Sequence, residues 1–263
     1  MKTTLYFIWI IILTSCFHKN SDNIVCEKFQ IPVITQTKLD SSVYYNSDSL
    51  SFSMSWFVGK YKFCDTVNLT SKDDTTNKDD LIRDFVKPNY NDSLFTDGLQ
   101  IIVDYQNTII QEVPYLEKNI NCYPVFVINE TNSTKILTGK DSHVFIIQEA
   151  LDSSKQWHPI NGKGFDFCGN GHWGVKIYPK EFALFLAPKY NGDFETLIRI
   201  RLKIGDNIYV TKPFTGKIKY SQFYLRQNDI YSRRMKDEAN AIMSWFYGSP
   251  PKGIDHKENS YIV

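Results

Sequence analysis

One loop of the sequence, FDFCGNGHW at Phe165 to Trp173, gathers side chains that could do chemistry. Asp166, Cys168 and His172 supply a carboxylate, a thiol and an imidazole, which could ligate a metal or act as orienting group, nucleophile and base. The glycines in and before the loop permit positive φ and close approach of the backbone to a ligand. All these groups lie in one loop with no partner evident elsewhere, so the pattern favours a disulfide-pinned turn over an active site. Together with Trp173, they form the candidate binding loop.

The cysteines indicate which parts of the chain could be joined by disulfides. Apart from Cys16, the chain has Cys26, Cys64, Cys122 and Cys168, and four cysteines in an exported chain permit two disulfides in three connectivities. Pairs that stay within their own regions would be Cys26–Cys64 and Cys122–Cys168, and four free thiols are the alternative. No Cys-x-x-Cys spacing, P-loop, dinucleotide fingerprint or metalloprotease motif occurs, so neither a metal nor a cofactor is expected.

The first sixteen residues decide where the chain is expected to reside. Lys2 precedes an apolar run from Leu5 to Leu13, which is too short to cross a bilayer of ~30 Å but suits the core of an export signal. The run ends in Leu13-Thr14-Ser15-Cys16, which resembles the lipobox of bacterial lipoproteins. The resemblance implies that residues 1–15 are a cleaved signal peptide and that Cys16 carries the lipid. An ordinary secretory signal and an uncleaved signal anchor are the alternatives.

The same resemblance implies a location in the cell envelope. The lipid on Cys16 would make the membrane a partner, and residues 16–26 would be the lipidated tether. Phe17 stands where enteric-type lipoproteins retained at the inner membrane tend to have Asp, which favours the outer membrane, facing the periplasm or the surface.

The amino-acid composition indicates what kind of domain follows the predicted signal peptide and tether. The chain has 263 residues, of which 42% are hydrophobic, so a substantial core is expected. The net charge of +1 provides no electrostatic drive toward nucleic acid, which is therefore not an expected partner. Aromatic residues make up 15% of the chain, which suits β-strands.

Short alternating segments separated by turn residues predict a mainly β fold, an antiparallel sandwich over residues 96–226. The candidate strands are Leu99–Tyr105, Thr108–Val113, Tyr123–Asn129, Val144–Glu149, Trp173–Ile177, Phe182–Ala187, Leu197–Ile204, Ile208–Thr211 and Lys217–Leu225. Leu197–Ile204 (LIRIRLKI) alternates cleanly and predicts a solvated face that carries Arg199, Arg201 and Lys203.

Residues 27–95 are expected to form an accessory N-terminal β region. Leu50 to Trp56 alternates large residues with serines, Gly59-Lys60 could turn the chain, and Tyr61 to Leu69 would complete a hairpin. A short helix is predicted over Leu81 to Val86. Whether the region is a separate domain or completes the sandwich is left open by the sequence.

Near the C-terminus the sequence pattern changes from that of strands to that of a helix. Residues 227–248 place apolar side chains on one helical face and charged ones mostly on the other, with Asn228 or Asp229 as N-cap and Gly248 at C′. Packing on the sandwich is the favoured role of this helix, and docking to a partner is the alternative. Residues 249–263 are predicted to form a flexible tail.

Several motifs extend the resemblance: Tyr123-Pro-Val-Phe-Val-Ile-Asn, Val144-Phe-Ile-Ile-Gln-Glu-Ala, Trp157-His-Pro-Ile and Tyr190-Asn-Gly-Asp-Phe-Glu-Thr. They are similar to a group of uncharacterised bacterial lipoproteins with an immunoglobulin-like body, which implies an immunoglobulin-like sandwich. We therefore expect a non-enzymatic envelope lipoprotein that binds a protein or glycan partner. The alternatives are an envelope hydrolase using the Asp166, Cys168 and His172 loop, and an immunity-type lipoprotein that blocks an effector.

Overall fold

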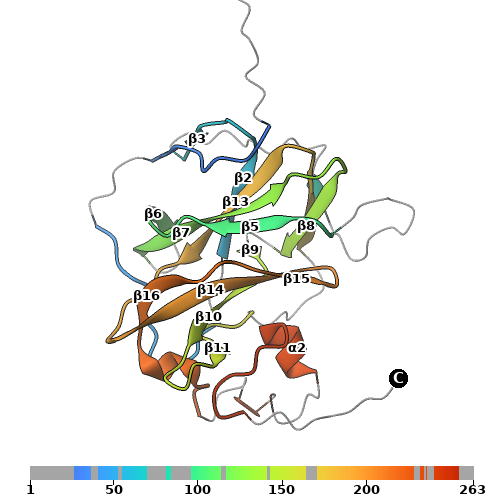
Figure 1. Ribbon diagram of the computed structural model, residues 1–263. Helices are drawn as coiled ribbons and strands as arrows, with labels where there is room; N and C mark the ends of the chain where they lie inside the picture. Colours follow the sequence, from blue (N-terminus) through green and yellow to red (C-terminus); the bar gives the residue numbers. More distant parts are fainter. Residues whose placement is uncertain are drawn as a thin grey trace, which may run out of the picture.

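A computed structural model provides the structure of the protein. It describes residues 27–36, 41–52, 55–69, 81–83, 96–113, 117–140, 143–163, 171–227, 232, 233, 235 and 240–254. Two antiparallel sheets are stacked face to face, which confirms the predicted mainly β sandwich (Figure 1).

The larger sheet has nine strands. In spatial order they are β4 (Leu81–Arg83), β12 (His172–Ile177), β8 (Lys135–Lys140), β9 (His143–Val144), β2 (Ser55–Lys62), β13 (Glu181–Pro188), β7 (Lys118–Asn129) and β5 (Gln100–Val103), with β6 (Ile109–Val113) also paired to β7. The smaller sheet has five. They are β11 (Trp157–Pro159), β10 (Ile146–Leu151), β14 (Phe194–Ile204) and β15 (Asn207–Val210), with β16 (Phe214–Ile218) also paired to β14. A separate parallel pair joins β1 (Ile34–Thr35) to β3 (Val67–Asn68).

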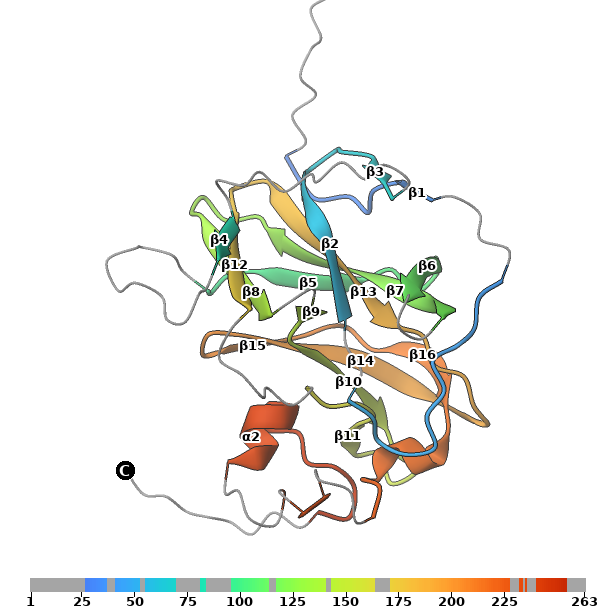
Figure 2. The same ribbon diagram turned by 180° about the vertical axis from the view of Figure 1, so that it is seen from behind.

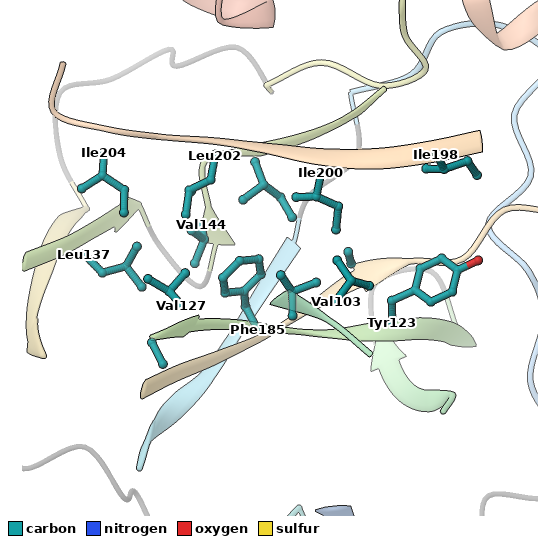
Figure 3. Packing of buried hydrophobic residues seen from close by; sticks show 14 of the residues in the cluster. Val103, Tyr123, Val127, Leu137, Val144, Phe185, Ile198, Ile200, Leu202 and Ile204 are labelled. Atoms are coloured by element: carbon teal, nitrogen blue, oxygen red, sulfur yellow. The ribbon is translucent and has the colours of Figure 1, made fainter. Parts of the chain in front are cut away.

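The core lies between the two sheets, and β14 shows why this sequence forms it. Its β-branched and aliphatic residues recur at every second position, so one face of the strand is continuously apolar. Figure 3 shows these side chains pointing from β14 toward the larger sheet. They are Ile198, Ile200, Leu202 and Ile204, and they face Val127, Leu137, Val144 and Phe185 in the same buried cluster.

The N-terminal region completes the sandwich. Strand β2 lies inside the larger sheet, between β9 and β13, so the part of residues 27–95 that it forms belongs to the sandwich. Gly59 and Lys60 continue β2 and do not turn the chain, so the predicted hairpin is wrong. Pairing with β13 explains this, because it satisfies the backbone of β2 through both residues, with a register shift between Leu184 and Phe185.

The larger sheet is covered on its outer face as well. Phe29 lies against the rings of Phe63, Phe126 and Phe182, with centroids 5.2–5.7 Å apart. The view from behind shows the N-terminal strands β1 and β3 at this end of the molecule (Figure 2). Because side chains of both faces are covered, every residue of β13 is buried, which explains its unbroken apolar run from Phe182.

Two further predictions are corrected. Leu81–Arg83 is strand β4 and not the start of a helix, since it pairs with β12 at the edge of the larger sheet. The strand predicted over Lys217–Leu225 ends at Ile218 and is followed by a 3-10 helix at Tyr220–Phe223. The backbone N–H of Lys219 donates to the Gln222 side chain at 2.9 Å, which stabilises this turn.

The C-terminal helix is present, and its described part is divided. Ser232, Arg233 and Met235 are helical, Asn240 is not, and α2 (Ala241–Phe246) starts after it. A single helix from 227 to 248 is therefore wrong. Gly248 adopts φ +83° just beyond the helix, at the predicted C′ position.

Helix α2 packs on the outer face of the smaller sheet. Trp245 and Phe246 are buried in one cluster with Ile147 of β10 and with Leu50. Beyond the helix, the Lys252 backbone N–H donates to Phe223 O at 3.0 Å, and its ammonium pairs with Asp152. The tail is thus bound to the body as far as residue 254, contrary to the prediction of a flexible tail from 249.

Candidate functional site

The loop singled out by the sequence is only partly described. Asp166 and Cys168 lie outside the described residues. His172 opens β12 opposite Lys140 and is half-buried, and Trp173 packs against Phe57 with ring centroids 4.9 Å apart. Because Trp173 is only 7% exposed, it is a core residue and offers no open ring to a ligand. Within the described residues, no three His, Cys, Asp or Glu side chains are grouped closely enough to hold a metal.

Two glycines in and before this loop lie within the described residues, Gly162 and Gly171. A Cβ on Gly162 would lie 2.6 Å from the Phe246 ring and 2.7 Å from the Phe52 ring. Gly162 thus permits a close approach, as expected, but to two aromatic rings, that of Phe246 in α2 and that of Phe52. Gly171 adopts φ +80°, a conformation that favours glycine immediately before β12.

The cysteines correct one predicted disulfide. Cys122 is free and fully buried on β7, among apolar side chains that include Trp56 and Leu186, so it does not pair with Cys168. Burial raises the pKa of its thiol, which makes it inert. Cys64 is in a disulfide.

The partner of Cys64 remains a prediction, since Cys16, Cys26 and Cys168 lie outside the described residues. Two contacts favour Cys26. The Glu27 carboxylate accepts from Lys180 Nζ at 2.9 Å, and the Lys180 carbonyl accepts from the N–H of Phe63, the residue before Cys64, at 2.9 Å. The chain segment that follows Cys26 therefore lies beside Cys64.

The outer face of the smaller sheet holds a buried carboxylate between two arginines. Glu149 on β10 is directly opposite Arg199 on β14, and its Oε2 accepts from Arg199 Nε at 2.6 Å. Its Oε1 accepts from Arg201 Nε at 3.1 Å. Glu149 is fully buried, whereas the arginine side chains are 20% and 18% exposed. This cluster, which sequence reasoning missed, lies on the face that was predicted to be solvated.

Each arginine is held by a further contact. The Arg199 guanidinium lies over the Trp157 ring, 4.1 Å from its centroid, and such stacking fixes the plane of the group. Arg201 Nη1 donates to the Tyr247 carbonyl just beyond α2 at 3.3 Å. The terminal Nη1 and Nη2 of Arg199 have no hydrogen-bond partner in the described part of the chain.

Exposed aliphatic side chains border the arginines. Leu197 precedes Arg199 on the same face of β14, and Val210 and Ile208 of β15 are opposite Arg201 and Lys203. Leu197, Ile208 and Val210 are 40%, 39% and 41% exposed. We call this surface the β14 face. It consists of Leu197, Arg199, Arg201, Lys203, Ile208 and Val210. Helix α2 covers the neighbouring Ile147 but leaves these aliphatic side chains open.

A second polar cluster lies around Asp152, at the start of the β10–β11 turn. Its solvent-inaccessible carboxylate accepts from the Ser154 hydroxyl at 2.8 Å, from the Gln156 N–H at 2.9 Å and from Lys252. His158 Nε2 lies 3.5 Å away. Because Ser154 bonds directly to Asp152, the cluster lacks the serine–histidine contact of a catalytic triad. Its role is to hold residues 249–254 on the sheet.

Comparisons with protein-family models, with curated proteins and with solved structures find no match to this chain. None of the helices in the described ranges has the length and apolar character needed to cross a membrane. The β14 face is therefore the site from which a function is argued.

Proposed function

We propose that this protein is a lipid-anchored, non-enzymatic binding module of the cell envelope, and that it holds a protein partner on the β14 face. The observation that carries the proposal is the combination of three cationic and three aliphatic side chains on one sheet face, with the aliphatic ones about 40% exposed. Arginine is enriched at protein interfaces, and a partner that covered the aliphatic side chains would gain from their burial.

The arrangement of the body supports the anchor. The Glu27 side chain bonds Lys180 at one end of β13, while the smaller sheet and α2 lie toward the opposite side (Figure 1). The eleven residues 16–26 span at most about 40 Å, so a lipid on Cys16 would hold the larger sheet nearer the membrane. The β14 face would then be turned away from the bilayer and open to a partner.

The anchor is tested by intact mass after expression of the full chain in a bacterial host, with Cys16→Ala as the matched variant. We expect a mature chain that begins at Cys16 and carries acyl groups, and loss of that modification and of membrane fractionation in Cys16→Ala. An unmodified secreted chain would contradict the anchor and leave a soluble binding protein.

An immunity-type role is the second candidate, since a cationic face bordered by aliphatic groups suits the acidic rim of an effector's cleft. It is distinguished by co-expression with the product of a neighbouring toxin gene, which the protein should neutralise. The hydrolase alternative requires a reactive Cys168. Rapid alkylation of Cys168 at neutral pH and loss of a measurable hydrolysis in Cys168→Ala would favour it.

A further inference from the structure

We propose that the Nη1/Nη2 edge of Arg199 is a receptor for a side-chain carboxylate, so that the partner presents an acidic residue flanked by apolar ones. The inference rests on the proposed function and specifies the chemistry of the partner. Arg199 would be the residue that determines specificity, and the rest of the β14 face would provide complementary contacts.

The first step is the fixed orientation of Arg199. Glu149 occupies its Nε at 2.6 Å, and Trp157 supports its plane at 4.1 Å. A guanidinium held in this way loses little conformational freedom when a ligand binds. The two contacts leave the terminal nitrogens, whose parallel N–H groups match the two oxygens of a carboxylate.

The second step is charge. Arg199, Arg201 and Lys203 follow one another on the same face, and the only carboxylate bonded to them among the described residues is that of Glu149. Both Glu149 oxygens are already used by the arginines. Glu195 lies on the same sheet face beyond Leu197, but it is directly opposite Lys217 on β16, so this pair adds no net charge. The three cations and Glu149 leave a net charge of +2 at the β14 face, which complements an acidic surface.

The third step distinguishes a protein segment from a free anion. Residues two apart on a strand lie about 7 Å apart on the same face, so Leu197 is adjacent to the position that a bound carboxylate would take. Val210 of β15, opposite Arg201, borders the same area, and Ile208 extends the apolar surface beside Lys203. A small anion would leave these aliphatic groups in water, whereas an acidic residue with apolar neighbours would cover them.

The experiment uses the full-length, membrane-anchored protein in its own cells, with a benzophenone amino acid in place of Val210. We expect a crosslink to a protein, at a peptide that contains Asp or Glu. Arg199→Gln, which leaves Glu149 paired with Arg201, should lower the yield at least about tenfold, the effect of losing a charge-assisted hydrogen bond. Lys118→Gln is the control and should leave the yield unchanged, because Lys118 is an exposed residue at the start of β7 in the larger sheet.

The outcomes separate the two proposals. An unchanged crosslink in a variant that retains the wild-type melting temperature would overturn the role of Arg199 and leave the β14 face as the interface. Absence of a protein crosslink from position 210, or one only to lipid or glycan, would overturn the face itself and with it the proposed function. Conversion of the partner's carboxylate to an amide should reproduce the tenfold loss, and a smaller effect would again exclude Arg199.

Discussion

Glu149 and Arg199 are directly opposite each other on β10 and β14, and the buried carboxylate accepts the Nε hydrogen of the arginine at 2.6 Å. The register of the two strands thus sets the position of an arginine whose side chain is 20% exposed. The same carboxylate also holds Arg201, so one acidic residue fixes both arginines of the proposed binding face.

Replacement of Glu149 by Gln should destabilise the fold by about 3 kcal/mol, because it leaves two mostly buried arginines without their anion. The value is at the low end for a broken buried pair, since each arginine remains about a fifth exposed. Chemical denaturation at neutral pH measures it. Glu195→Gln removes an exposed carboxylate 3.9 Å from Lys217 and should cost less than about 0.5 kcal/mol. Equal effects would contradict a structural role for Glu149.

The ion cluster of Glu149, Arg199 and Arg201 is not expected to stabilise the sheet more than apolar side chains of similar size would. Buried ion triads can be replaced by apolar residues of similar size with little loss of stability. The triple variant Glu149→Met, Arg199→Met, Arg201→Leu should therefore be more stable than Glu149→Gln alone, as measured by the same denaturation. If the triple variant is as unstable as the single one, the charges are needed for folding, and their retention would no longer favour a role in binding.

The sequence predicts β14 well and its surroundings less well. Strict alternation places Ile198 and Ile200 in the core and Arg199 and Arg201 on the other face, as observed. It cannot reveal that the arginines are largely covered, because this depends on Glu149 and Trp157, which are some 40 to 50 residues away in the chain. A lone acidic residue in a predicted strand was the only available signal.

Contacts between distant segments also explain why the predicted hairpin at Gly59-Lys60 and the predicted helix at Leu81 are wrong. Gly59-Lys60 has the composition of a turn, but it remains extended because long-range pairing with β13 outweighs the local preference. Leu81–Arg83 is a strand for a similar reason, since β12 provides an edge to pair with. Strand pairing joins distant segments, and no local pattern in one sequence specifies which segments meet.

Gly162 is predicted to tolerate no side chain, because a Cβ would lie 2.6 Å from Phe246 and 2.7 Å from Phe52. Gly162→Ala should destabilise the protein by about 1–3 kcal/mol through overpacking under α2. Phe52→Leu removes one of the two rings and should reduce the cost of the alanine. A double-mutant cycle by thermal denaturation checks this, and additive effects would mean that the rings are not the cause.

The cysteines can be assigned by peptide mapping without reduction. Burial raises the pKa of Cys122, so iodoacetamide should not modify it in the native protein at pH 8 but should do so after unfolding. Cys64 should be recovered in a disulfide-linked peptide, and we predict Cys26 as its partner. A peptide that links Cys64 to Cys168 would contradict this pairing, and labelling of native Cys122 would contradict its burial.

Asp152 should make stability depend on pH in the acid range. Burial alone would raise the pKa of this carboxyl, but hydrogen bonds from Lys252, from the Gln156 N–H and from Ser154 outweigh it and hold the pKa well below its usual range. Because the folded pKa is depressed, the contribution is fully present above about pH 4, the value for an unfolded Asp, and is lost as pH falls toward the folded pKa. The free energy of unfolding of the wild type should therefore fall between pH 5 and pH 2, whereas Asp152→Asn should start lower and fall less steeply. Parallel slopes for the two proteins in urea titrations at these pH values would show that Asp152 is not the group responsible.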